Sequence, residues 1–145
     1  MNLTKHFTLA ELTVSQEAAR RGISNEPDAE ALENLKTLAL TLEAVRELLG
    51  HPVLISSGYR SPKVNSAVGG SRTSAHMQGL AADFICPGFG SPREIVNAIS
   101  NSQIRFDQLI NEFGSWVHIG VSPTMRGQVL IASRRDGKVH YERMT

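Results

Sequence analysis

The chain has 145 residues, of which 41% are hydrophobic and 20% charged, a composition typical of an ordinary globular protein and not of a disordered one. A single core is expected at this length, so the sequence predicts one domain over residues 1–145. Fifteen Lys and Arg against fourteen Asp and Glu leave a net charge of +1, which excludes the strongly basic surface that nucleic-acid binding requires.

Membrane insertion is not expected either. Residues 1–22 lack the apolar stretch of about 7–15 residues that a secretory signal peptide carries, and no apolar run of about 18 residues is present to span a bilayer. We therefore expect a protein that is cytoplasmic as synthesised. The single cysteine, Cys86, cannot form an internal disulfide and is expected to be a small buried hydrophobic residue.

Short helices and then one long helix are expected in the first third of the chain. Thr8 followed by Glu11 has the spacing of a capping box, and Gly22 can end the segment that begins there. Over residues 29–49 apolar side chains recur at helical spacing, and Gly50 follows as a stop signal. These apolar residues are Leu32, Leu35, Ala39, Leu42, Val45 and Leu49. The long helix should pack this face against a sheet.

Strands are expected on both sides of a loop rich in glycine. Residues 52–56 form a short apolar run that predicts a strand ending shortly before Arg60. Residues 64–74 are rich in Gly, Ser and Asn and are expected to form an irregular surface loop. Residues 80–85 predict the next strand, and a capping signature predicts a helix over residues 91–100.

The last third of the chain has mostly strand patterns. Strands are expected over residues 106–112, 115–121 and 128–132, and residues 134–137 predict a turn into a further run that ends near Tyr141. Helices early in the chain and hairpin-like strands late in it predict an α+β domain. In this domain the N-terminal helices pack on a small, mainly antiparallel sheet that carries the functional site.

Three residues have the types and the order of a catalytic zinc site. Such a site takes about three nitrogen, sulfur or oxygen ligands from the protein and keeps one further position open. In the segment SAHMQGLAAD, Gly79 permits the chain to turn between His76 and Asp83. In the segment WVHIG, strand alternation places His118 on the face opposite its apolar neighbours. Asp83 and His118 can meet if their two strands are neighbours, which spacing alone does not establish.

A lone histidine is more often a surface or hydrogen-bonded residue than a metal ligand. The pattern HxxGxAxD followed by HxG, with GYRSP upstream, is much harder to obtain by chance and favours the metal interpretation. With these motifs the sequence resembles, over about residues 5–125, the M15 family of zinc D-alanyl-D-alanine carboxypeptidases and phage endolysins. The resemblance implies one zinc ion per chain held by His76, Asp83 and His118, and a peptidase that acts on the peptide part of bacterial peptidoglycan.

The resemblance also implies that Arg60, in the motif SGYRSP, orients the substrate or stabilises charge. The alternative for Arg60 is a structural ion pair on a loop. A base must take the proton of the attacking water, and Glu112 is the candidate because Gly114 can turn the chain and carry this carboxylate back beside the metal. Some family members instead have an acidic residue three positions before the last histidine, where this chain has Ser115.

Two further residues are candidates for substrate contacts. Ser74 stands shortly before His76 and can form a hydrogen bond there, although a plain turn residue is the simpler interpretation. Trp116 can line the substrate cleft, or it can pack over the metal.

Two functions from different classes fit these patterns. The first is a hydrolase of peptidoglycan stem peptides or crosslinks, either a D,D-carboxypeptidase or an endopeptidase. As a phage or prophage lysis enzyme it would act on the cell wall after release or export. The second is a non-catalytic, zinc-containing module that binds peptide or wall, such as a structural component of a virion. A set of three protein ligands favours the hydrolase, because structural zinc almost always has four protein ligands. We expect a monomer.

Overall fold

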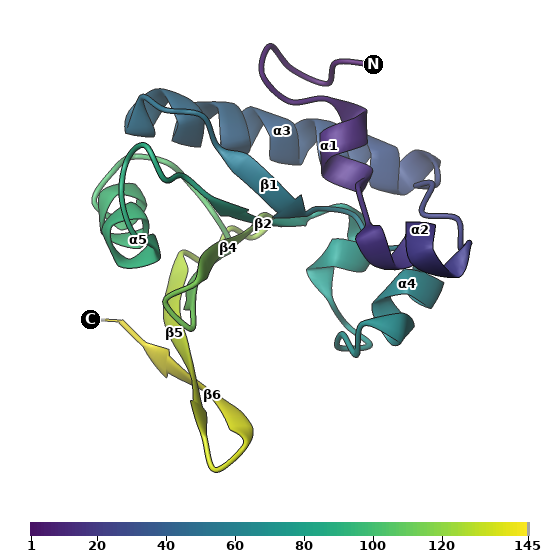
Figure 1. Cartoon of the computed structure of the whole chain (residues 1–145). Coiled ribbons are helices and arrows are strands. Elements are labelled where there is room, and N and C mark those ends of the chain that lie inside the picture. The colour runs from purple at the N-terminus through teal and green to yellow at the C-terminus, as the bar shows by residue number, and fades with distance from the viewer. Residues whose placement is uncertain (145) are drawn as a thin grey trace.

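The computed structural model describes residues 1–144 (Figure 1). Its strands form one sheet in the order β1-β2-β4-β3-β5-β6, in which only β3 and β5 run parallel to each other. The helices are α1 (Leu9–Thr13), α2 (Gln16–Arg21), α3 (Ala29–Leu49), α4 (Pro62–Ala67), the short 3-10 helix η1 (Ala75–Gln78) and α5 (Pro92–Ser100). The strands are β1 (Leu54–Ser57), β2 (Ala81–Ile85), β3 (Gln108–Glu112), β4 (Trp116–Gly120), β5 (Gln128–Arg135) and β6 (Lys138–Arg143). The predicted α+β fold with a mainly antiparallel sheet is confirmed.

Three predicted capping residues bound the N-terminal helices: Thr8 begins α1, Gly22 ends α2 and Gly50 ends α3. The Thr8 hydroxyl accepts a hydrogen bond from the backbone N–H of Glu11, and the Glu11 carboxylate accepts one from the backbone N–H of Thr8. Helix α3 begins after the cap Asp28 and ends at Gly50, which takes up the left-handed conformation with a φ of 69°. Within residues 1–144 no helix is long and apolar enough to cross a membrane.

The main core lies between helices α3 and α5 and one face of the sheet. Burial of this apolar surface supplies most of the driving force for folding. Cys86 is fully buried in the same core, as expected for a small hydrophobic residue. The largest contributions from the helices and the sheet are Leu35, Leu38, Leu42, Ile95, Ile99, Phe84, Leu109 and Ile119. The opposite face of the sheet carries only a smaller apolar cluster, formed by Ile110, Leu130 and Ala132 with Phe113 packed against it.

One expectation about the loops is wrong in part. Residues 62–67 form helix α4, whereas residues 64–74 were expected to be irregular throughout. The reason is a local capping signal: the Ser61 hydroxyl accepts from the backbone N–H of Val64, and Pro62 occupies the first turn, where its missing N–H costs nothing. The side chain of Val64 is buried, so this short helix is anchored in the fold. The irregular loop follows the helix and leads to η1.

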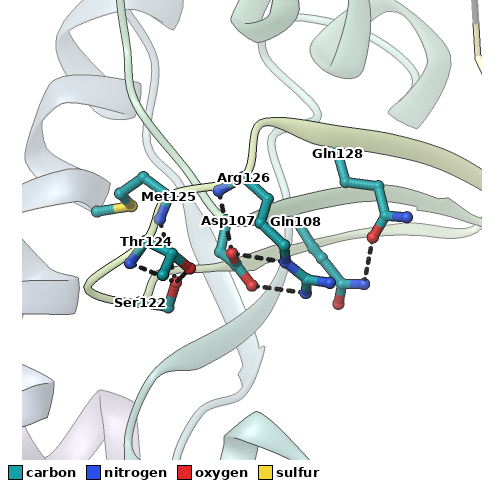
Figure 2. A network of polar contacts seen from close by, with 7 residues as sticks. All are labelled: Asp107, Gln108, Ser122, Thr124, Met125, Arg126 and Gln128. Atoms are coloured by element: carbon teal, nitrogen blue, oxygen red, sulfur yellow. Dashed lines mark hydrogen bonds and ion pairs between the residues drawn. The ribbon is translucent and has the colours of Figure 1, made fainter.

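The connection from β4 to β5 crosses the end of β3 and is fixed by a polar network (Figure 2). The Asp107 carboxylate accepts hydrogen bonds from Nε and Nη2 of Arg126, at 2.9 and 2.8 Å, and from the Arg126 backbone N–H at 3.1 Å. Beside it, Nε2 of Gln108 donates to Oε1 of Gln128 at 2.8 Å, which joins the first residues of β3 and β5. These contacts set the parallel register of the two strands.

The C-terminal hairpin of β5 and β6 extends the sheet beyond β3 (Figure 1). Its turn residues Asp136 and Gly137 have φ angles of 53° and 75°, the conformation that matches the twist of a two-residue hairpin. The predicted turn within residues 134–137 is confirmed. The last strand includes Tyr141, as expected, and ends at Arg143.

Candidate metal centre

The pairing of β2 with β4 brings Asp83 and His118 together. The strands are antiparallel neighbours, and these two residues are direct partners across the ladder. The residues that flank them, such as Phe84 and Ile119, are fully buried in the main core on the other face. Alternation therefore directs the carboxylate and the imidazole to the face away from the core, as expected for His118. The adjacency that spacing left open is present in the structure.

His76 reaches the same point from η1, the short helix before β2. Ser74 caps this helix through a hydrogen bond from the His76 backbone N–H at 3.2 Å. Gly79 ends the helix with a φ of 74°, and a Cβ at this position would lie 2.6 Å from the carbonyl oxygen of Ala31 in α3. Only glycine meets both conditions without strain, so the sharp turn predicted between His76 and Asp83 depends on it.

The ring of His76 is held in one orientation. Its Nδ1 lies 2.7 Å from the carbonyl oxygen of Gly58, and the side chain is buried. A carbonyl oxygen only accepts hydrogen bonds, so Nδ1 carries the proton and donates. The other ring nitrogen, Nε2, is then left with its lone pair directed at Asp83, 3.4 Å from Oδ1. A backbone carbonyl that fixes the ring in this way is the usual support of a metal-binding histidine.

The donor atoms of His76, Asp83 and His118 all lie within 4.8 Å of one another. Nδ1 of His118 is 2.9 Å from Oδ1 of Asp83, and the two imidazole rings meet edge to face at 5.1 Å between centroids. Ligands that surround one zinc ion tetrahedrally at about 2 Å lie about 3.3 Å apart, so the observed separations suit such an ion. Two imidazole nitrogens and a carboxylate oxygen are also the donor types that zinc accepts.

The Asp83 carboxyl is ionised in this environment. Burial favours the neutral acid, but the hydrogen bond from Nδ1 of His118 and the nearby ring of His76 outweigh burial and hold the pKa of Asp83 well below its usual range. A buried negative charge between two imidazoles creates a strong attraction for a cation. The chemistry of the donor set therefore fits a divalent metal.

Glu112 lies on the same face, at the end of β3. Its partner across the ladder is Trp116, while Ile110, two residues before it, is the partner of His118. Glu112 is only 9% exposed, and this burial raises the pKa of its carboxyl. The charge of Asp83 raises the same pKa further, whereas the charge of His118 lowers it. A turn over residues 113–115, in which Phe113 and Gly114 have φ angles of 60° and 68°, returns the chain into β4. The turn predicted at Gly114 is present.

Ser115 does not take the place of an acidic residue in the site. It is exposed in the turn and, by alternation, belongs to the face of Val117, away from Asp83 and His118. Its hydroxyl contacts the carbonyl oxygen of Phe113 at 3.5 Å. Of the two positions that the sequence offers for a base, the structure brings only Glu112 to the face of the candidate metal centre.

Arg60 lies beside the metal centre on the segment that follows β1. Its backbone N–H donates to the carbonyl oxygen of His76 at 3.0 Å, and Nη2 donates to the Ser74 hydroxyl at 3.2 Å. The Nε atom is buried without a hydrogen-bond partner. Burial lowers the pKa of Arg60, and the charge of Asp83 opposes this shift. Within residues 1–144 Arg60 makes no ion pair within 4.0 Å, so the alternative of a structural ion pair does not hold.

Trp116 is half-buried on the site face and contacts Phe113 edge to face, with ring centroids 5.6 Å apart. The guanidinium of Arg134 stacks on the other aromatic ring of this pair, 4.8 Å from the centroid of Phe113. The aromatic pair thus closes the Glu112 end of the site. Tyr141, from β6, also belongs to this face but was not recognised as a site residue from the sequence. Local pattern gives no signal for it, because its position depends on the pairing of β6 with β5.

The comparisons with known proteins agree with this geometry. The family described as Peptidase M15 matches residues 5–120, which is most of the chain and includes all three candidate ligands. No curated protein is significantly similar to the chain in sequence. The chain therefore belongs to the peptidase M15 family, whose members are metallopeptidase hydrolases.

Proposed function

We propose that this protein is a zinc-dependent peptidase that hydrolyses peptide bonds in the stem peptides or crosslinks of bacterial peptidoglycan. One observation carries the proposal: in a chain of the M15 family, the donor atoms of His76, Asp83 and His118 converge within 4.8 Å on the face of the sheet opposite the core. These three side chains would hold one zinc ion. When bound, zinc supplies Lewis-acid chemistry that activates water and polarises the scissile carbonyl.

Glu112 is the proposed general base. It would take a proton from the attacking water and give it to the leaving amine as the peptide bond breaks. Its position on the site face supports this role, as does burial, which raises the pKa of the carboxyl and so makes it a stronger base. The carboxyl is not one of the three convergent donors, so it is free to act on protons.

Arg60 is the proposed substrate-orienting residue. The cost of partly burying its guanidinium is compensated if a carboxylate of the substrate binds the remaining N–H groups. Ser74 would hold the guanidinium in place through the hydrogen bond to Nη2 and at the same time cap the helix of His76. Trp116 would form part of the cleft wall next to Glu112.

The proposal is tested with purified protein and isolated peptidoglycan. Mass analysis of the digest should show new fragments cut within the stem peptide or crosslink, and the mass of each fragment distinguishes a carboxypeptidase from an endopeptidase. A chelator should abolish cleavage, and added zinc should restore it. Cleavage that survives complete removal of metal would contradict the proposal. A protein that binds zinc and peptidoglycan but releases no amines would instead be the non-catalytic wall-binding module.

A further inference from the structure

The hairpin of β5 and β6 lies beyond residue 120, where the match to the M15 family ends. It is nevertheless part of the same sheet, because β5 pairs in parallel with β3, the strand of Glu112. Figure 1 shows the hairpin as the yellow-green extension of the sheet, which ends in β6. The site face of the sheet is therefore larger than the family core alone.

The strand register places one side chain of the hairpin in the row of Glu112. Ala132 of β5 is the direct partner of Glu112, and Tyr141 of β6 is the direct partner of Ala132. Direct partners share a face of the sheet, so Trp116, Glu112, Ala132 and Tyr141 form one row across four strands. Tyr141 thus faces the same side as the candidate metal centre.

The residue between Glu112 and Tyr141 in this row is the small Ala132. Two strand spacings, about 10 Å, separate the backbones of Glu112 and Tyr141. The Ala132 methyl group is the only side chain that stands between them in this row, and it is buried in the small apolar cluster against which Phe113 packs. The Tyr141 side chain is 56% exposed, so its hydroxyl is accessible to a ligand.

The electrostatics agree with this placement. Partial burial raises the pKa of Tyr141, and the negative charges of Glu112 and Asp83 raise it further. The phenol therefore stays protonated at neutral pH and is a hydrogen-bond donor that faces the site.

The hairpin is held firmly enough to present this hydroxyl. The network of Asp107 and Arg126 fixes the start of β5 (Figure 2), and the carbonyl oxygen of Ala132 accepts a hydrogen bond from the backbone N–H of Phe113 at 3.1 Å. At the chain end, the backbone N–H of Met144 donates to the carbonyl oxygen of Val129 at 3.0 Å.

We propose that Tyr141 is a substrate-contacting residue whose hydroxyl donates a hydrogen bond to a carbonyl oxygen of the bound peptide. Arg60 lies on the β1 side of the metal centre and Tyr141 on the β6 side, so the two donors hold the peptide from opposite ends of the site. The hairpin thus supplies one side of the proposed peptide-binding site. This inference rests on the proposed peptidase function and names the residue that positions its substrate.

The test uses the full chain and the variant Tyr141→Phe, which removes only the hydroxyl. His140→Phe is the matched control, because His140 pairs with Ser133 on the opposite face of the same strand. Turnover of a synthetic stem pentapeptide that ends in two D-alanines is measured with zinc, and affinity for the same peptide is measured by calorimetry without zinc. The melting temperature of each variant verifies folding.

Tyr141→Phe should lower kcat/KM about tenfold and weaken peptide binding to the zinc-free chain by a similar factor, whereas His140→Phe should change each less than about twofold. Normal binding and turnover in Tyr141→Phe would overturn the role of Tyr141 while leaving the peptidase intact. If the wild-type chain binds the peptide without cleaving it, only the peptidase function fails, and the calorimetric comparison still decides on Tyr141. A wild-type chain that neither binds this peptide nor cleaves isolated peptidoglycan overturns both.

Discussion

The two faces of the sheet are built from the same strands but have different tasks. On β4, Ile119 is fully buried in the core, whereas its neighbour His118 faces the candidate metal centre. On β2 the same alternation separates Phe84 from Asp83. One face therefore provides stability through burial of apolar surface, and the other carries the candidate metal ligands and the proposed base. Adjacent residues should respond to mutation in opposite ways.

The sharpest test of this contrast uses two neighbouring residues. His118→Ala should abolish stoichiometric zinc binding and all zinc-dependent turnover, because one of three ligands is lost. Its free energy of unfolding without metal should fall little. Metal content by mass spectrometry and chemical denaturation of the zinc-free chain measure the two effects.

Ile119→Ala is the partner variant on the core face. It should lower the free energy of unfolding by about 2–5 kcal/mol, because it leaves a cavity in the main core, while the folded fraction keeps its zinc. Full zinc occupancy in His118→Ala, or an unchanged unfolding curve in Ile119→Ala, would break the division between the two faces.

Glu112→Gln should separate chemistry from metal binding within the site face. The amide keeps the size of the side chain but cannot accept the proton, so turnover should fall by about 10²- to 10⁴-fold while zinc stays bound. The control is Glu142→Gln, which changes an acid of β6 that pairs with Arg135 away from the site. Near-normal hydrolysis by Glu112→Gln would assign the base to another residue.

Gly79→Ala probes the turn between His76 and Asp83. The left-handed φ of 74° and the close approach to the Ala31 carbonyl should together cost about 1–3 kcal/mol of unfolding free energy and weaken zinc binding through His76. Gly22 is the matched control, since it has a φ of 66° but open space around it. If both alanine variants lose the same stability and bind zinc equally well, the contact with α3 is unimportant.

Asp107 belongs to neither the core face nor the site face. Asp107→Asn should therefore have the smallest effect, a modest change in the free energy of unfolding. Hydrogen bonds from Arg126 hold the pKa of Asp107 below its usual range, so the folded chain keeps this carboxylate ionised to lower pH than the unfolded chain does. The stabilisation, about 1 kcal/mol, is complete above the unfolded pKa of about 3.9 and is lost as the pH falls below it. Urea unfolding between about pH 6 and pH 3 should show wild type and variant converging at low pH; parallel profiles would contradict this.

Much of the fold follows from local signals in the sequence. The long helix over residues 29–49 has its cap, its apolar stripe and its glycine stop within one segment, and its bounds agree with the structure. The same is true of the face of His118, which depends only on alternation. Helix α4 was missed because the Gly and Ser content after it outweighed the capping signal of Ser61 and Pro62.

What the sequence alone could not predict depends on contacts between distant strands. The pairing of β2 with β4 could only be assumed, and the parallel pairing of β3 with β5 was not expected at all. Tyr141 reaches the site face only through two successive registers, each set far from the residue itself. The support of His76 by the Gly58 carbonyl is likewise a tertiary contact without a local pattern.

The zinc site is tested most directly by anomalous X-ray scattering at the zinc absorption edge, with crystals of the wild-type chain grown in the presence of zinc. One peak per chain is expected, about 2 Å from Nε2 of His76, a carboxylate oxygen of Asp83 and Nδ1 of His118. A map without a peak between these three side chains, or with its zinc bound elsewhere, would contradict the assignment.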